Sequence, residues 1–208
     1  MKTVLTLLLV AGLAAMAPPA SAQSTTKDLE NMLYLDLKSG RVAIELRPDL
    51  APKHVERIKK LTREKFYDGL TFHRVIDGFM AQTGDPTGTG RGSSDYPDLP
   101  AEFSDVPFGQ GTLGAARSSN PNSANSQFFI CFEAAPWLNG KYTVIGQVVR
   151  GMAHVNRIKR GDRRSGAVDN PDKIVRMLVA ADAKDHSVLR QGADGAAPSS
   201  SGARRGSH

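Results

Sequence analysis

The stretch FHRVIDGFMAQTGD, residues 72–85, decides the fold of this chain. Its apolar residues form two strand-like runs, 71–76 and 79–83, which the Asp77-Gly78 pair separates as a turn would. A second stretch, NSQFFICF at residues 125–132, has the same strand character. Both stretches place amide side chains among apolar ones, so they indicate more than core filling.

The amides and the apolar groups share faces of their strands. In an extended strand residues i and i+2 point to the same side, so Met80 accompanies Gln82, and Gln127 accompanies Phe129. If the two strands are neighbours and Arg74 lies on a third, one face presents apolar groups beside two amides and a guanidinium. Such a face suits an apolar ring held between polar groups that bind a peptide.

Apolar residues also alternate with a period of two on the N-terminal side of these stretches. Residues 33–37 and 42–46 alternate around Lys38-Ser39-Gly40, which predicts a hairpin. A helix is expected from Pro52, because apolar residues recur at helical spacing up to Leu61. Further strand-like runs cover residues 111–116, 143–149 and 174–180, and a second helix is expected around Met152, Val155 and Ile158.

Many short strands with two helices, and no repeated strand-helix alternation, indicate a mainly β fold that hides its sheet edges. We expect a closed antiparallel eight-stranded β-barrel capped by two α-helices. A barrel alone does not determine a function, because function depends on the site that the fold carries.

The N-terminal segment has the features of a secretory signal peptide. Lys2 supplies a positive charge, residues 4–17 are apolar apart from Thr6, and Ala20-Ser21-Ala22 forms a small-residue cleavage site. A membrane anchor is the alternative, but the apolar stretch is shorter than the roughly 18 residues that a spanning helix needs. We expect cleavage before Gln23, export across the inner membrane and a periplasmic location.

The whole chain is expected to divide into consecutive parts. Residues 1–22 are the signal peptide, 23–30 a flexible leader, 31–185 the folded domain and 186–208 a disordered tail. The tail is small and polar, so it cannot bury enough apolar surface to offset the entropy cost of ordering.

Composition limits the classes of function. Of 208 residues, 40% are hydrophobic and 23% charged, which excludes collagen-like, wholly disordered and polytopic membrane proteins. The formal net charge of +6 becomes +5 when cleavage removes the single charge of Lys2. We expect no nucleic-acid partner, because the basic residues within 157–164 are interrupted by Gly161 and Asp162 and lack interleaved aromatic rings.

Several common catalytic patterns are missing from the sequence. Gly88, Gly90 and Gly92 have neither dinucleotide spacing nor the Lys-Ser/Thr of a phosphate loop, so they indicate a glycine-rich turn. The five histidines form no i, i+4 pair, and His73 alone lies inside one of the two stretches. Cys131, the single cysteine, is expected to be a buried apolar side chain, and it precludes an intramolecular disulfide. We expect no metal and no cofactor.

The two stretches in this order and spacing, followed by PWLNGKY at residues 136–142, resemble the cyclophilin family of peptidyl-prolyl cis-trans isomerases over about residues 31–182. The resemblance implies a cyclophilin-like barrel that accelerates rotation about Xaa-Pro peptide bonds without a cofactor or a covalent intermediate. The implied partners are proline-containing unfolded or partly folded exported proteins, with cyclosporin-like cyclic peptides as inhibitors. We expect a monomer without stable membrane insertion.

The resemblance also implies roles for individual residues. Arg74 matches the catalytic arginine, and it is the natural donor to a prolyl nitrogen that regains its lone pair when the peptide bond twists. Gln82 matches the amide that binds the substrate backbone, and Trp137 the tryptophan linked to binding of cyclosporin-like peptides. The proline pocket corresponds to Phe79, Met80, Phe129 and Leu138, and the other groove positions are Ala116, Arg117, Gln127 and Tyr142.

The chain departs from the usual family pattern within one part of the groove. Arg117 stands where many cyclophilins have Asn, which is expected to change charge preference while backbone contacts remain. Tyr142 stands where many have His, which keeps an aromatic wall but loses a titratable imidazole. The segment 117–124 is slightly longer than in well-known eukaryotic relatives, as it is in bacterial ones.

Each candidate residue also has a purely structural interpretation. In that interpretation Arg74 forms a structural ion pair, and Phe79, Met80 and Phe129 fill the core. Gln82 and Gln127 are then ordinary surface amides, and Trp137 covers a loop. Two other functions stay open: a carrier with a ligand in a hollow barrel, and a chaperone that binds proline-containing segments without isomerising them.

Overall fold

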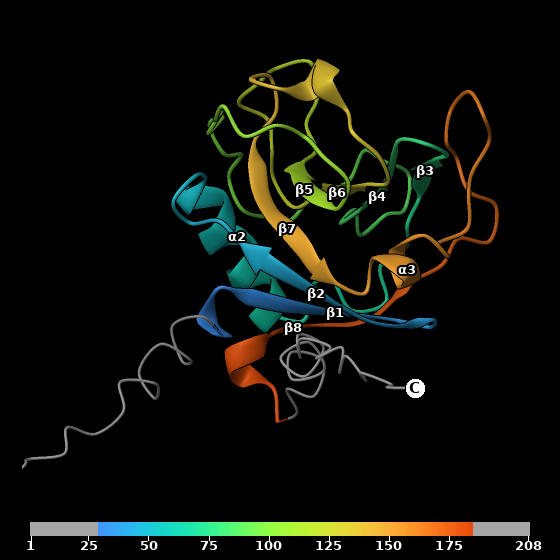
Figure 1. Ribbon diagram of the computed structural model, residues 1–208, viewed down its shortest axis with the longest axis horizontal. Helices are drawn as coiled ribbons and strands as arrows, with labels where there is room; N and C mark the ends of the chain where they lie inside the picture. The colour runs from blue at the N-terminus through green and yellow to red at the C-terminus, as the bar shows by residue number, and fades with distance from the viewer. Residues whose placement is uncertain (1–28, 185–208) are drawn as a thin grey trace, which may run out of the picture.

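The computed structural model describes residues 29–184, and within them eight strands form one antiparallel sheet (Figure 1). The strands lie in the order β3-β4-β6-β5-β7-β2-β1-β8. Their bounds are β1 Met32–Leu37, β2 Gly40–Leu46, β3 Arg74–Ile76, β4 Met80–Thr83, β5 Thr112–Ala115, β6 Phe128–Cys131, β7 Val144–Arg150 and β8 Ile174–Val179. The predicted signal peptide, most of the leader and the tail lie outside the described residues.

The predicted hairpin is confirmed as β1 and β2. Leu33 pairs with Ile44 and Leu37 with Gly40, so the chain reverses within the predicted turn. Gly40 is required there because its φ is +139° and a Cβ would overlap the imidazole of His154.

Two α-helices, α2 (Pro52–Arg63) and α3 (Met152–Val155), flank the sheet in Figure 1. Pro52 occupies the first turn of α2, as predicted, and the apolar face of the helix is buried. The helix has no side-chain cap of its own, so the Glu102 carboxylate accepts hydrogen bonds from the backbone N–H of Lys53 and of His54, both at 3.1 Å. Short 3-10 turns, η1 (Pro136–Leu138) and η2 (Ala180–Asp182), complete the elements. Among residues 29–184 no helix is long and apolar enough to cross a membrane.

The prediction of a closed barrel is wrong, because the sheet forms an open half-barrel with β3 and β8 at its edges. The chain that follows α3 returns beside β3 as a loop rather than as a strand. Isolated bridges join Thr71 to Lys173 and Arg74 to Ala167, and Val75 N–H donates to the Gly166 carbonyl. This loop covers the exposed edge of β3, which removes the need for β3 and β8 to pair.

Apolar residues pack on both faces of the strands that carry the site. Ala81 and Ile130 point into the main core, which also contains the buried apolar residues of both helices. Met80 and Phe129 point the other way, into a second apolar cluster. The main core fills the space between the sheet and the helices, so the part of the chain that the structure describes has no lumen for a carried ligand.

Candidate functional site

Strand register places three predicted site residues in one row. Arg74 lies opposite Gln82, and Gln82 lies opposite Phe129, across β3, β4 and β6. Directly opposite residues of antiparallel strands share a face, so the guanidinium, the amide and the ring meet on one side of the sheet. This confirms the predicted arrangement, in which the two amide-bearing stretches are neighbours and Arg74 lies on a third strand.

The row continues to Gly114 on β5, a residue that the sequence did not single out. Gly114 lies opposite Phe129, and a Cβ at this position would overlap the rings of Phe129 and Phe108. The two rings stack with centroids 5.8 Å apart. The missing side chain therefore allows Phe129 to lie flat over the strand.

A depression of about 270 Å³ opens over this row, and we call it the apolar hollow. Met80, Phe129 and Leu138 are buried at its base, whereas Trp137 is 55% exposed at its edge and contacts Phe79. The structure brings together every predicted site residue except Gln127 here: Arg74, Phe79, Met80, Gln82, Ala116, Arg117, Phe129, Trp137, Leu138 and Tyr142.

The guanidinium of Arg74 is held by neutral oxygen atoms. Its Nε donates to the Ser165 carbonyl at 3.2 Å and its Nη1 to Gln82 Oε1 at 3.2 Å. Among residues 29–184 no carboxylate lies within ion-pair distance of Arg74, so the structural ion pair is not observed. Within the described part of the chain two of its five N–H donors are used, which leaves the others for a ligand.

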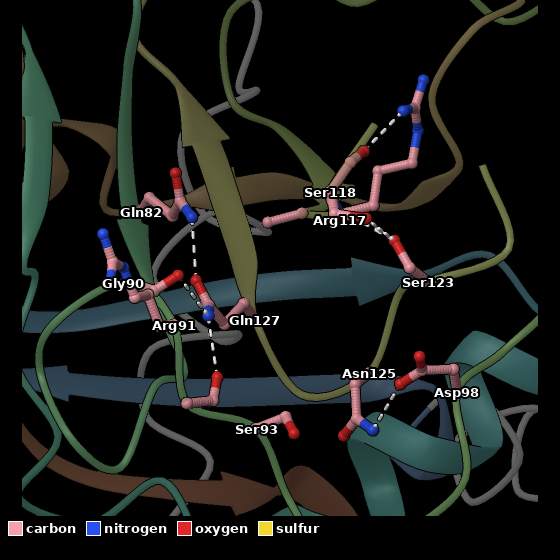
Figure 2. A pocket seen from close by; sticks show the side chains of 12 residues that line it. Gln82, Gly90, Arg91, Ser93, Asp98, Arg117, Ser118, Ser123, Asn125 and Gln127 are labelled. Carbon is pink, nitrogen blue, oxygen red and sulfur yellow. Dashed lines mark hydrogen bonds between the residues drawn. The ribbon is translucent and has the colours of Figure 1, made fainter. Parts of the chain in front are cut away.

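A chain of amides connects Arg74 to the glycine-rich loop, and Figure 2 shows its part from Gln82 through Gln127 to the loop. Gln82 Nε2 donates to Gln127 Oε1 at 2.8 Å, and Gln127 Nε2 donates to the carbonyls of Gly90 at 3.2 Å and Gly92 at 2.8 Å. Carbonyls only accept and a guanidinium only donates, so the two ends of the chain determine how both amides are oriented. Gln82 and Gln127 are therefore not freely rotating surface amides.

The glycine-rich loop is itself organised by Asp85, which is 1% exposed. Its carboxylate accepts hydrogen bonds from the Thr87 N–H at 2.7 Å, the Thr87 hydroxyl at 2.8 Å and the Gly90 N–H. Burial raises the pKa of Asp85, but these hydrogen bonds and one from Gly92 outweigh burial and hold the pKa below its ordinary value. The structure thus confirms a turn, and the carboxylate gives the turn its shape.

A second depression of about 460 Å³, the polar hollow (Figure 2), shares lining residues with the apolar hollow and adjoins it. Gln127 lies here, and the two hollows share Gln82, Ala116 and Arg117. Sequence reasoning missed most of the lining, which comes from loops: Gly90, Arg91, Gly92, Ser93, Asp98, Ser118, Ser123 and Asn125. Asn125 opens the second quoted stretch, but no periodicity marks the others.

The two residues that depart from the family pattern contact each other. The Arg117 guanidinium lies 4.2 Å from the centroid of the Tyr142 ring, and Tyr142 meets Phe129 edge-on. Arg117 also donates to the carbonyls of Ser118 at 2.8 Å and Lys141 at 2.9 Å. Arg117 and Tyr142 thus form one wall where the hollows join.

Most of the metal-ligating side chains and the one thiol of the described residues lie apart from each other or from the two hollows. They contain no group of three or more His, Cys, Asp or Glu side chains suited to a metal ion. Cys131 is buried, as predicted, and burial raises the pKa of its thiol to about 12. His73 is also buried, burial lowers its pKa, and it lines neither hollow.

The chain is similar to proteins of one family. The family model described as cyclophilin type peptidyl-prolyl cis-trans isomerase/CLD matches residues 32–179. A probable peptidyl-prolyl cis-trans isomerase of Brucella suis is 55% identical over 189 residues, which cover 85% of this chain and 96% of the relative. The peptidyl-prolyl cis-trans isomerase ppi1 of Schizosaccharomyces pombe is 41% identical over 150 residues, which cover 70% and 95%.

Solved structures show the same similarity. A cyclophilin from Hirschia baltica superposes with a TM-score of 0.68 at 25% identity, over 81% of this chain and 83% of that one. A cyclophilin-type isomerase of Cryptosporidium parvum, crystallised in the presence of the dipeptide Ala-Pro, gives a TM-score of 0.65 at 28% identity, over 71% and 98%.

Proposed function

The chain belongs to the cyclophilin-type peptidyl-prolyl cis-trans isomerase family and is a peptidyl-prolyl isomerase, and we propose that Arg74 drives the reaction by hydrogen bonding to the prolyl nitrogen. One observation carries this proposal. The guanidinium of Arg74 lies at an apolar hollow, is fixed by Gln82 and Ser165, and keeps unused N–H donors.

The reaction needs neither a nucleophile nor a metal. Resonance opposes rotation about the peptide bond with a barrier of about 18–20 kcal/mol, and uncatalysed Xaa-Pro isomerisation takes about 10–100 s. In the twisted transition state the prolyl nitrogen becomes pyramidal and regains a lone pair. A donor held at that position binds the transition state more tightly than the planar ground state, which is the condition for catalysis.

Arg74 cannot supply the whole effect. Reaching milliseconds requires roughly a 10⁴-fold acceleration, or about 5.5 kcal/mol. One charge-assisted hydrogen bond contributes about 1.5–3 kcal/mol. The remainder must come from removing the proline ring from water in the apolar hollow and from holding the flanking peptide groups.

Gln82 is suited to the second task. Its Nε2 carries two N–H donors, of which Gln127 Oε1 accepts one, so the other can donate to a substrate carbonyl. Met80, Phe129 and Leu138 form the apolar base for the proline ring. Substrate would then lie between a fixed amide and a fixed guanidinium, which hold its backbone while the bond turns.

Arg74→Ala tests the mechanism. We expect kcat/KM for a short Xaa-Pro peptide to fall by roughly 10- to 100-fold, measured by two-dimensional NMR exchange, with peptide affinity largely retained. Arg150→Ala is the matched control, because Arg150 lies at the end of β7 and lines neither hollow. Undiminished turnover in Arg74→Ala would rule out the proposed role, and would leave a role in binding alone.

We further propose that the protein acts as a monomer on proline-containing polypeptides that are exported with it to the periplasm. The support is the N-terminal pattern of Lys2, the apolar residues 4–17 and the small residues before Gln23. The mass of the protein recovered from the periplasm of the expressing cell should correspond to a chain that begins at Gln23. An uncleaved cytoplasmic product would contradict the location but not the activity.

A further inference from the structure

We propose that the substrate groove, meaning the apolar and polar hollows together, prefers proline-containing segments with a carboxylate side chain close to the proline. Arg91 and Arg117 would determine this preference. The inference rests on the proposed function, because it concerns which substrates the same site selects.

The three arginines of the groove have no carboxylate partner among the described residues, a property that they share with Arg57, Arg150, Arg157, Arg163 and Arg164. Ion pairs to carboxylates occupy the following arginines outside the groove: Arg41, Arg47, Arg63, Arg160 and Arg176. Arg74, Arg91 and Arg117 all line the groove, and among residues 29–184 none of the three lies within ion-pair distance of a carboxylate. Their positive charge is therefore not neutralised by the described part of the chain.

Neutral groups hold the Arg117 guanidinium in place. Carbonyls of Ser118 and Lys141 accept its hydrogen bonds, and the Tyr142 ring covers its face. These contacts immobilise the guanidinium without cancelling its charge, so little side-chain entropy is lost when an anion approaches. Arg117 is a wall of both hollows, which places this charge beside the proline pocket.

Arg91 contributes charge from the glycine-rich loop. Its side chain is exposed and lines the polar hollow. Arg91, Arg117 and Gln127 line the same hollow (Figure 2), so a peptide held near that amide lies in a depression that two arginines help to form. The loop that carries Arg91 is held by the Asp85 carboxylate and by Gln127, which limits how far the cation can move away.

One carboxylate, Asp98, is present among the lining residues of the two hollows. Its Oδ1 accepts a hydrogen bond from Asn125 Nδ2 at 3.0 Å, at the end of the polar hollow away from Gln82 in Figure 2. Three arginines against one aspartate leave the groove positive. A positive cleft concentrates anionic ligands and repels cationic ones.

The expected effect is moderate, because Arg91 is exposed to water and Arg117 is partly exposed. A single exposed ion pair changes affinity by about two- to fivefold. Such interactions weaken as the screening length falls from about 20 Å to about 5 Å between low and high salt. The preference should therefore be measurable at low ionic strength and should shrink when salt is added.

The test uses acetylated and amidated peptides with one proline and a single Glu, Gln or Lys placed one or two residues before or after it. Glu and Gln have nearly the same shape, so their ratio of kcat/KM isolates charge. We expect the best Glu peptide to exceed its Gln counterpart by about fivefold at low salt, and Lys to be the poorest. A ratio near one at every position, or a preference for Lys, would overturn the inference.

Arg91→Gln and Arg117→Gln assign the preference to residues. Each should lower the Glu/Gln ratio by about two- to threefold, and together they should bring it near one. Arg150→Gln removes the same charge outside the groove and should leave the ratio unchanged. The ratio is measured within one preparation, so partial misfolding does not affect it. A Glu/Gln ratio that stays unchanged in both groove variants would refute the assignment to Arg91 and Arg117. If the unsubstituted protein failed to isomerise even the Gln peptide, the proposed function would be refuted instead.

Discussion

The two hollows are built in different ways. The apolar hollow rests on strands, where the register of β3, β4, β6 and β5 aligns Arg74, Gln82, Phe129 and Gly114. The polar hollow is formed mainly by loops, which hydrogen bonds from side chains to backbone hold in shape. The sheet therefore positions the groups proposed for catalysis, and the loops carry the groups proposed for substrate selection.

The hydrogen-bonded chain from Gly92 through Gln127 and Gln82 to Arg74 connects the polar hollow to the apolar hollow. A substitution that displaces the strands should then lower the rate of isomerisation most. A substitution in the loops should affect Arg74 only through the two glutamine side chains. The following variants test that order.

The largest effect is expected from Gly114→Ala, which acts on the strands. The added methyl group overlaps the rings of Phe129 and Phe108 and must push Phe129 into the apolar hollow. Displacements of about 1 Å can cost up to about 10²-fold, so kcat/KM should fall by tens of fold, up to that limit. Gly109→Ala is the control, because a Cβ there meets nothing within 4 Å. Equal activity of the two variants would contradict a rigid apolar hollow.

A smaller effect is expected from Gln127→Ala, which cuts the amide chain. Gln82 loses the acceptor of its Nε2, and Arg74 keeps a partner that is itself less well held. We expect kcat to fall by about tenfold, the equivalent of about 1.4 kcal/mol. Gln147→Ala removes an amide that also donates to a backbone carbonyl, that of Gln110, but lies outside both hollows. A change in KM alone would mean that Gln127 only contacts substrate.

Trp137→Ala should have a weaker effect on short peptides. The ring is 55% exposed at the edge of the apolar hollow, so its loss removes contact area without moving Arg74 or Phe129. Turnover of a tetrapeptide should fall by about threefold, while affinity for a cyclosporin-like cyclic peptide, which covers more of the edge, should fall further. Phe103→Ala, at a 44% exposed ring that lines neither hollow, should change neither quantity.

The smallest effect on turnover is expected from the His54–Glu102 pair, which lines neither hollow. Burial lowers the pKa of His54 below 6.5, although hydrogen bonding to Glu102 opposes the shift. Burial raises the pKa of Glu102, but hydrogen bonds from His54 and from the α2 backbone outweigh burial and hold it below 4.5. Both groups bind protons more readily when unfolded, so the free energy of unfolding should decrease as the pH falls, first below 6.5 through His54 and then below 4.5 through Glu102.

Thermal unfolding tests whether stability falls with pH as expected. The Tm should drop by a few degrees between about pH 7 and pH 5, and His54→Gln should reduce that drop. Turnover well below the Tm should be the same in both proteins, because the pair does not touch Arg74 or the amides. A Tm that rises on acidification would contradict the assignment of a neutral, buried imidazole to His54.

The sequence predicted the strand faces well because they depend on near neighbours. Alternation placed Met80 with Gln82 and Gln127 with Phe129. The register puts Met80, Gln82 and Phe129 on the face of Arg74, and the hydrogen bond from Gln82 joins Gln127 to them. Closure of the barrel was predicted wrongly, since it depends on how the chain after α3 returns. That segment bonds to β3 as a loop, a choice that no periodicity records.

The loop residues of the site were harder to predict for the same reason. Arg91 and Asp98 have no pattern that separates them from solvent-exposed residues. They line a common hollow because the loop of Arg91 is bonded to Gln127 and that of Asp98 to Asn125. Arg117 and Tyr142 were each recognised as departures from the family pattern, but their mutual contact became visible only in three dimensions.

Residue types and short-range periodicity thus determined which groups this protein offers: one guanidinium, two amides and a set of apolar side chains that alternate along short strands. The tertiary structure decided what those groups do together. It set the register that aligns Arg74 with Phe129, the orientation of both amides and the unneutralised charge of the groove. The physical reason is separation along the chain, because alternation arises between residues two apart, whereas register, hydrogen-bond direction and charge pairing depend on segments tens of residues apart.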